Sequence, residues 1–182
     1  MAIDKIDVTK GIIGTLPVAN GGTALTSGFV NGGVNTPSFW AGRTATQSSI
    51  SSGTATKVQF STEAWDSDGN YDSSTNYRFT PTTAGKYFYS AGIQCYAASG
   101  VNNNSRMYLQ LYKNGSSLVR DATQASMSGG NSFPSAMIVG YILQMNGSSD
   151  YVEGYIYQDH GSNRDVRFGS ETHFSGFRIA GV

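Results

Sequence analysis

The sequence predicts an all-β fold of antiparallel strands, and three observations lead to this prediction. Short segments beyond residue 38 alternate apolar and polar side chains, and clusters of Gly, Asn, Ser and Asp separate them, as expected of strands joined by tight turns. Apolar residues do not recur at the spacing of an amphipathic helix. Phe29 is the only aromatic residue before position 38, and all others follow it. The chain is therefore expected to consist of an extended arm, residues 1–38, and one β domain, residues 39–182.

Several strands of this domain show their two faces in the sequence. One predicted face carries Tyr87, Tyr89, Ala91, Ile93 and Cys95. Another carries Met107, Leu109 and Leu111. The second strand is expected to stop at Asn114-Gly115, because this pair adopts the positive φ angles that a two-residue hairpin turn needs. Cys95 is expected to be a small core residue, and as the only cysteine it excludes an internal disulfide.

The run 136–145 predicts a strand that is covered on both faces. One side is apolar at Met137, Val139, Tyr141, Leu143 and Met145. Ile138 and Ile142 occupy the other side. Because apolar residues on both faces are typical of a strand inside a sheet, the run is expected to form a central strand.

A stripe of tyrosines is predicted on the next strand. Val152, Gly154 and Ile156 share the inner face of the segment 151–157. Tyr151, Tyr155 and Tyr157 lie on its outer face. These rings are suited either to a subunit interface, where a rigid apolar body with a polar tip packs well, or to a stacking platform for sugars. Both interpretations stay open.

The arm combines glycine-rich, turn-rich sequence with apolar side chains. Its candidate anchor residues are Ile12, Ile13, Leu16, Pro17, Val18 and Leu25. Its many glycines raise the entropy cost of ordering the arm on its own. The arm is therefore expected to become ordered by attaching to a partner. The alternative is a flexible leader segment that has no partner. The phrase in residues 14–23, GTLPVANGGT, resembles one that recurs in bacteriophage fibre and appendage proteins, with Ala24 where that phrase continues with glycine. This resemblance implies a virion protein.

The domain itself resembles the C1q-like domain of the C1q and tumour-necrosis-factor superfamily. The segments that carry the resemblance are Phe39-Trp40-Ala41, Val58-Gln59-Phe60, Asp68-Gly69-Asn70-Tyr71-Asp72, Tyr77-Arg78-Phe79-Thr80-Pro81, Gly85-Lys86-Tyr87-Phe88-Tyr89, Leu111-Tyr112-Lys113-Asn114-Gly115, Leu143-Gln144-Met145 and Phe174-Ser175-Gly176-Phe177. The resemblance implies an antiparallel jelly-roll sandwich of about ten strands and a homotrimer. Gly147 and Asp150 are separated here by two serines, whereas the family often has Gly-Asp directly, so this loop is expected to differ in shape.

Charge and hydropathy exclude two classes of partner. Lys plus Arg equals Asp plus Glu, at 12 each, so no basic field attracts nucleic acid or an anionic membrane surface. No apolar run is long enough to insert into a membrane, and no signal peptide follows Met1. The protein is therefore expected to be made in the host cytoplasm and to reside in the virion.

The segment 66–72 resembles the start of a calcium loop. Its candidate ligands are Asp66, Asp68, Asn70 and Asp72. The rest of the calcium-loop signature is absent. Tyr71 occupies the position where the loop needs glycine for its turn, and Tyr77 occupies the position of the bidentate glutamate. The segment is therefore interpreted as a polar loop, and neither a metal nor another cofactor is expected.

The sequence contains no recognisable catalytic motif. Its two histidines, His160 and His173, lie in no nucleophile or zinc signature. Any two of Asp121, Asp150, Glu153, Asp159 and Glu171 could meet in space as a pair of carboxylates for glycoside cleavage. A non-enzymatic protein is expected.

Two functions follow from these features. The first is a trimeric virion component, either a capsid decoration or a short head fibre, that is anchored to other virion proteins by its arm and exposes its C1q-like head. The alternative is a tail-fibre receptor-binding module that recognises a host-surface glycan. The loops expected to hold such a glycan contain Asn102, Asn103, Asn104, Ser126, Gly129, Gly130, Asn131 and His160. The short distance between arm and head favours the first function.

Overall fold

The computed structural model describes residues 35–96, 105–125 and 135–180. These residues form thirteen strands, three of which are only two residues long, and no helix. The strands are β1 (Ser38–Gly42), β2 (Gln47–Ile50), β3 (Thr56–Lys57), β4 (Thr62–Asp66), β5 (Tyr71–Asp72), β6 (Arg78–Phe79), β7 (Gly85–Tyr96), β8 (Ser105–Lys113), β9 (Ser116–Ala125), β10 (Ser135–Met145), β11 (Val152–Gln158), β12 (Arg164–Val166) and β13 (His173–Ala180). The predicted all-β antiparallel class is confirmed, and β1 begins at Ser38.

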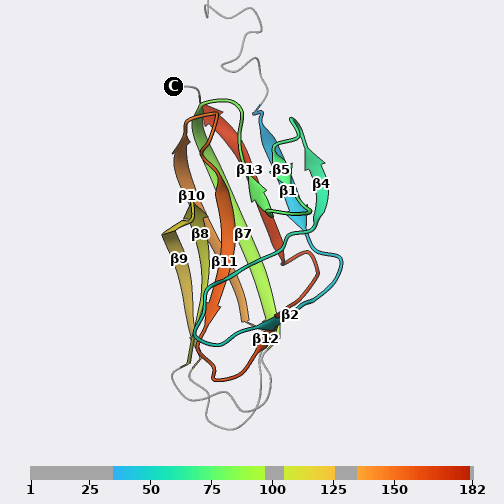
Figure 1. Ribbon diagram of the computed structural model, residues 1–182, viewed down its shortest axis with the longest axis vertical. Helices are drawn as coiled ribbons and strands as arrows, with labels where there is room; N and C mark the ends of the chain where they lie inside the picture. The colour runs from blue at the N-terminus through green and yellow to red at the C-terminus, as the bar shows by residue number, and fades with distance from the viewer. Residues whose placement is uncertain (1–34, 97–104, 126–134, 181–182) are drawn as a thin grey trace, which may run out of the picture. The chain divides into compact units, whose positions relative to one another are not determined.

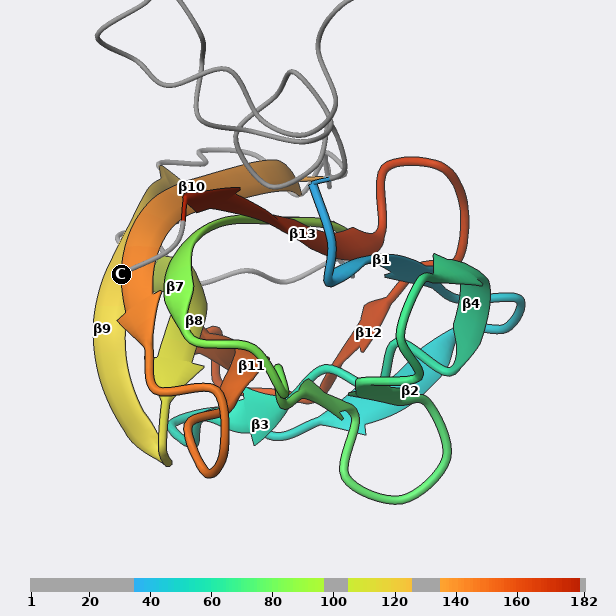
Figure 2. The ribbon, with the colours of Figure 1, turned by 90° about the horizontal axis from the view of Figure 1, so that it is seen from above.

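The strands pair into two antiparallel sheets (Figure 1). The first has the order β2-β12-β7-β13-β1-β4, with β10 on the free side of β7, and the second has the order β5-β6-β11-β8-β9, with β3 beside β11. Figure 2 shows β13 and β1 on one side of the interior and β11 and β3 on the other. Neighbours such as β7 and β13 are far apart in sequence, as in a jelly roll.

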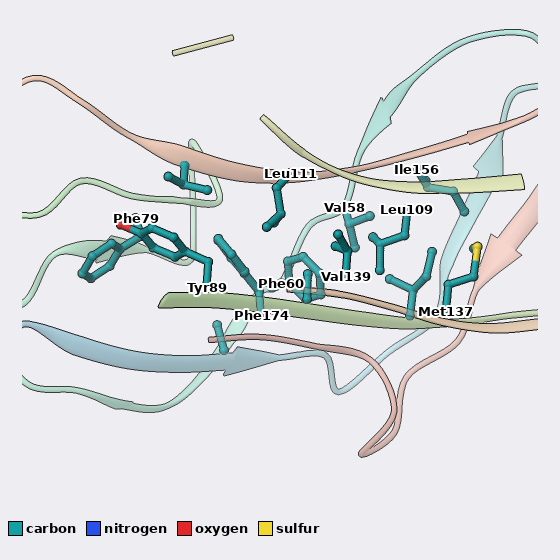
Figure 3. Close-up of a cluster of buried hydrophobic side chains, with 14 of the residues drawn as sticks. Val58, Phe60, Phe79, Tyr89, Leu109, Leu111, Met137, Val139, Ile156 and Phe174 are labelled. Carbon is teal, nitrogen blue, oxygen red and sulfur yellow. The ribbon is translucent and has the colours of Figure 1, made fainter. Parts of the chain in front are cut away.

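The core lies between the sheets and is formed by the inward faces of their strands. The predicted inner face of β7, from Tyr87 to Cys95, is fully buried, as is the inner face of β11 at Val152 and Ile156. Leu109 and Leu111 of β8 point across the interior towards Val139 and Met137 of β10 (Figure 3). Burial also raises the pKa of the Cys95 thiol to about 12, so this side chain is a neutral core residue.

Aromatic rings fill one end of this core. Phe39 stacks on Phe79 with ring centroids 4.3 Å apart, and it meets the edge of Phe174 at 4.9 Å. Phe174 also contacts Phe60 and Tyr89. Such contacts add to the free energy gained by burying the rings, so this cluster is expected to be a main source of the domain's stability.

Gly154 shows why the sequence needs glycine in β11. An added Cβ at this position would lie 2.9 Å from Cε2 of Phe60. The ring of Phe60, which is fully buried, occupies the space that a side chain would take. The glycine therefore lets the Phe60 ring pack directly against the β11 backbone.

The predicted hairpin turn at Asn114-Gly115 is confirmed. Asn114 and Gly115 have φ angles of 51° and 77°. The turn joins β8 to β9, and a bulge between Leu111 and Tyr112 shifts the register of the pair by one residue. A two-residue turn with positive φ angles matches the twist of the strands that it connects.

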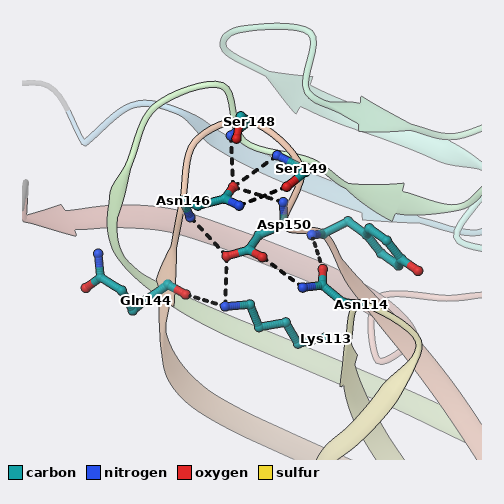
Figure 4. A network of polar contacts seen from close by, with 8 residues as sticks. Lys113, Asn114, Gln144, Asn146, Ser148, Ser149 and Asp150 are labelled. Atoms are coloured by element: carbon teal, nitrogen blue, oxygen red, sulfur yellow. Dashed lines mark hydrogen bonds and ion pairs between the residues drawn. The ribbon is translucent and has the colours of Figure 1, made fainter.

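Two loops at one end of the sandwich are tied together by Asp150 (Figure 4). Its carboxylate lies 2.8 Å from Nζ of Lys113 and accepts hydrogen bonds from Nδ2 of Asn114 and from the backbone N–H of Asn146. The side-chain oxygen of Asn146 accepts from three backbone N–H groups, those of Ser148, Ser149 and Asp150. Asn146 thereby closes the turn of residues 146–150.

Asp150 is expected to make the stability of the domain depend on pH. Burial alone would raise its pKa, but hydrogen bonds from Lys113, Asn114 and the Asn146 backbone outweigh burial and hold the pKa below its ordinary value. A carboxyl group with a lowered folded-state pKa stabilises the fold above its unfolded pKa of about 3.9 and loses that contribution as pH falls towards the folded value. We therefore expect Asp150→Asn to lower the urea midpoint at pH 7 and to shrink the loss of stability between neutral and acidic pH.

Lys113→Gln should shrink the same pH dependence, because it removes the ammonium group that favours the ionised carboxylate. Urea denaturation of each variant, followed by circular dichroism at several pH values, measures this directly. An acid dependence identical in both variants and in the unaltered protein would contradict the assigned role of Asp150.

The prediction that residues 136–145 form a central strand is wrong. β10 pairs only with β7 among the described strands, so it is an edge strand of its sheet. Ile138 and Ile142 on its outer face are 65% and 56% exposed. Tyr141 follows the inner alternation but is 44% exposed. Apolar residues on both faces of a strand do not reveal whether the strand has a neighbour at each edge. They are also found where another molecule covers the outer face of an edge strand.

Candidate functional site

The outer surface of the first sheet carries several large apolar side chains on neighbouring strands. This group, here called the apolar face, consists of Ile138 and Ile142 of β10, Phe88 of β7, Phe177 of β13, Trp40 of β1 and Trp65 of β4. The strand register places Ile142 beside Phe88, and Phe88 beside Phe177. The rings of Phe88 and Phe177 contact each other at 5.7 Å between centroids. Large apolar side chains grouped on one outer face in this way make the face a candidate interaction surface.

Small residues occupy the middle of the apolar face. Gly140, Ser90 and Ser175 lie side by side across β10, β7 and β13. A Cβ on Gly140 would lie 3.3 Å from Cζ of Phe88, so the glycine makes room for that ring. Small residues surrounded by bulky ones leave room for a partner to approach closely.

The far side of the apolar face is a stack of rings. Trp40 lies between Trp65, at 6.3 Å between ring centroids, and the imidazole of His173, at 6.2 Å. Burial lowers the pKa of His173, although hydrogen bonds involving the Glu171 and Ser170 backbones act in the opposite direction. His173 is thus a neutral ring in the stack at pH 7.

The predicted tyrosine stripe lies on the opposite surface, the outer face of the second sheet. Tyr155 stacks on Tyr112 with centroids 4.1 Å apart, and Tyr157 stacks on Tyr108 at 5.5 Å. Tyr151 lies under the guanidinium of Arg78, at 4.3 Å. The three predicted tyrosines therefore share one surface, where each packs against a residue of a neighbouring strand.

An ion pair between Lys57 and Glu153 lies within this stripe. Glu153 is 3% exposed, and its carboxylate lies 2.5 Å from Nζ of Lys57. The same ammonium group donates to the carbonyl of Asn76 and lies 5.9 Å from the ring centroid of Tyr155. Burial raises the pKa of Tyr155, and the negative charge of Glu153 adds to this effect, so the phenol remains neutral.

The candidate calcium ligands mostly hold their own loops together. Asp66 accepts from the backbone N–H groups of Asp68 and Tyr71. Asn70 bonds the Asp68 carbonyl and the Thr82 backbone. Within the described part of the chain, no group of three His, Cys, Asp or Glu residues is arranged to hold a metal ion.

The fourth candidate, Asp72, caps the turn that follows it. Its carboxylate accepts from the backbone N–H groups of Ser74, Thr75 and Asn76. These bonds, that from Thr75 most of all, hold its pKa far below the ordinary value despite the opposing effect of burial. The turn chemistry accounts for the oxygen-rich sequence of this segment.

The histidines and most candidate acids make structural contacts. His160 is buried and hydrogen-bonds through its backbone N–H to Gln158, which itself is fully buried and donates to the Ile50 carbonyl. Asp159 is paired with Arg106 at 2.9 Å, and Asp150 and Glu153 are paired with lysines as described above.

Several predicted residues lie outside the described ranges. These are the anchor residues of the arm, Ile12, Ile13, Leu16, Pro17, Val18 and Leu25, and the loop residues Asn102, Asn103, Asn104, Ser126, Gly129, Gly130 and Asn131. His160, grouped with those loops, is buried rather than available at the surface.

None of the described residues forms a helix long and apolar enough to cross a membrane.

The alternation of apolar and polar residues also contains a signal for the apolar face. Phe88 stands between two buried tyrosines of the same strand, so the alternation of β7 places it on the outer surface. Phe177 likewise lies outside while Phe174 lies inside. Large apolar side chains at outward positions of neighbouring strands indicate a covered surface.

Comparison with solved structures identifies the fold. An Eiger TNF structure from S. frugiperda aligns with a TM-score of 0.57 at 10% identity and covers 80% of this chain and 92% of its own. The globular domain of zebrafish complement 1qA aligns with a TM-score of 0.52 at 17% identity, covering 81% and 100%. Murine APRIL aligns with a TM-score of 0.55 at 9% identity, covering 78% and 98%. No protein-family model matches the chain, and its sequence matches no curated protein.

The described domain is therefore a jelly roll of the C1q and TNF type. At these identities the similarity concerns the fold alone. A shared fold does not determine function, which depends on the surfaces of the domain itself.

Proposed function

We propose that this chain is a non-enzymatic structural protein of a bacteriophage virion: a homotrimer that attaches through its arm and exposes its C1q-like heads. The observation that carries the proposal is the apolar face. Its exposed members, Ile138, Ile142, Phe177 and Trp65, are between 39% and 65% exposed in the protomer. Covering them on association would release free energy in proportion to the apolar area removed from water.

The position of this face suits association in a ring. β10 is the edge strand of its sheet, so the face reaches the border of the protomer, where a second copy can pack against it. A threefold arrangement is implied by the resemblance to the C1q-like domain. In a closed ring, the interface surface of every protomer is covered by a neighbouring protomer. The interface is thereby assigned to the first sheet, and Tyr151, Tyr155 and Tyr157 remain on the outside.

The virion part of the proposal is supported by the phrase in residues 14–23, which resembles a recurring phrase of phage fibres and appendages. The apolar residues of the arm gain stability only when a partner covers them. A capsid decoration or short head fibre fits an arm that leads almost directly into the head.

Removing residues 1–38 is expected to abolish attachment and to spare the head. A chain of residues 39–182 keeps the aromatic core and the apolar face, so it should remain a folded trimer by circular dichroism and light scattering. It should fail to join purified particles that lack this protein, whereas the full chain should join them. Equal decoration of such particles by both chains, measured by sedimentation with the particles, would place attachment in the head and remove the role proposed for the arm.

A further inference from the structure

A polar groove lies on the tyrosine-bearing surface of the second sheet. It has a volume of about 320 Å³, and its walls include Arg106, Tyr108, Gln110, Tyr112, Arg120 and Tyr157. The three strands β9, β8 and β11 supply these residues. This volume is at the lower end of the range of small-molecule sites, which is about 300–1,000 Å³.

The charge of the groove is positive. Arg120 is exposed and lies over the ring of Tyr108, 4.7 Å from its centroid, and it forms no ion pair with any carboxylate in the described part of the chain. Two acids of this surface whose side chains the structure describes are already neutralised, because Asp159 is bound to Arg106 and Glu153 to Lys57. The groove therefore offers one guanidinium that is free to bind an anion.

The floor of the groove carries an unused hydrogen-bond acceptor. Gln110 is 8% exposed and lies between Tyr155 and Arg120 in the strand register. Its side-chain oxygen is buried and has no hydrogen-bond partner among the described residues. A buried acceptor without a donor costs about 1–3 kcal/mol, so a donor brought by a ligand would be favoured there.

The tyrosines give the groove rigid walls with polar tips. Tyr108 and Tyr157 form one stacked pair and Tyr112 and Tyr155 another, and Gln110 follows Tyr108 and precedes Tyr112 on the same face of β8. Because the stacked faces contact each other, ring edges and hydroxyl groups are left to contact a ligand. Phenol hydroxyls both donate and accept hydrogen bonds, as do the hydroxyls of a sugar.

We propose that this groove binds an acidic sugar, a pyranose that carries a carboxylate, either free or within a polysaccharide. The carboxylate pairs with Arg120, sugar hydroxyls bond to Gln110 and to the hydroxyls of Tyr108 and Tyr112, and the apolar C–H groups contact the ring edges. The groove lies on the sheet opposite the apolar face, so this inference does not depend on the trimer or on the arm. If the protein recognises a host-surface glycan, this groove would be the binding site.

A titration of the full chain tests the proposal with three matched probes: sodium D-glucuronate, D-glucose and sodium acetate. Saturation-transfer NMR should show saturable binding of glucuronate with a Kd on the order of 1–10 mM. Glucose and acetate should bind at least about tenfold more weakly, because each lacks one of the two groups that the groove recognises. Arg120→Gln should weaken glucuronate binding about tenfold or more.

Arg78→Gln is the matched control, because Arg78 also lies over a tyrosine of this surface but outside the groove. It should leave the affinity for glucuronate unchanged, and both variants should keep the strand spectrum of the unaltered protein. The proposal is overturned if glucuronate shows no saturable binding, if glucose or acetate binds as tightly, or if Arg78→Gln weakens binding as much as Arg120→Gln does.

Discussion

Ile142→Glu is expected to convert the trimer into folded monomers. Ile142 lies at the edge of the apolar face and is 56% exposed in the protomer, so the protomer itself should tolerate glutamate with little loss of stability. In the proposed trimer, each copy would bury a carboxylate against apolar side chains, at a cost of several kcal/mol per ion. Light scattering should therefore report about one third of the mass of the unaltered assembly, with an unchanged circular dichroism spectrum.

Leu118→Glu is the matched control for this change. Leu118 is 45% exposed and belongs to β9 of the other sheet, so a glutamate there meets water in the protomer and in the proposed trimer. It should leave the mass unchanged. Retention of the full mass by Ile142→Glu, or its loss in Leu118→Glu as well, would remove the assignment of the apolar face as the interface.

Phe174→Ala is expected to cause the largest loss of stability within the protomer. Phe174 is fully buried and contacts Phe39, Phe60, Tyr71 and Tyr89 from both sheets. Truncating such a ring removes its burial and leaves a cavity, which typically costs about 3–5 kcal/mol. The free energy of unfolding from urea titration measures the loss under conditions where unfolding is reversible.

Phe168→Ala separates this effect from the mere removal of a phenylalanine. Phe168 is 55% exposed, so its truncation should change the free energy of unfolding by less than about 0.5 kcal/mol. Similar losses in the two variants would mean that the aromatic cluster is not the main support of the fold.

The sequence predicted local structure best where side chains alternate between an apolar core and water. The inner faces of β7, β8 and β11 and the turn at Asn114-Gly115 are confirmed, because alternation and turn chemistry are local properties. The bulge in the β8–β9 pair was not predicted, because the register of a hairpin also depends on packing across the strands.

The surfaces of the domain were harder to predict, because they depend on which strands become neighbours. Residues 136–145 were assigned to the middle of a sheet, yet β10 lies at its edge. The groove at Gln110 joins side chains from β8, β9 and β11, and a stripe of tyrosines on β11 alone does not indicate it. Which side chains share a surface depends on pairing between strands that are distant in sequence, and no local sequence pattern predicts that pairing.

The mass of the intact chain in solution tests the central claim most directly. Light scattering or sedimentation equilibrium across micromolar concentrations should give about three times the protomer mass of 19.3 kDa. Circular dichroism of the same sample should show a spectrum dominated by strand, the structure of the described residues. A well-folded species of 19.3 kDa throughout this range would contradict the proposed trimer and leave the apolar face without the partner assigned to it.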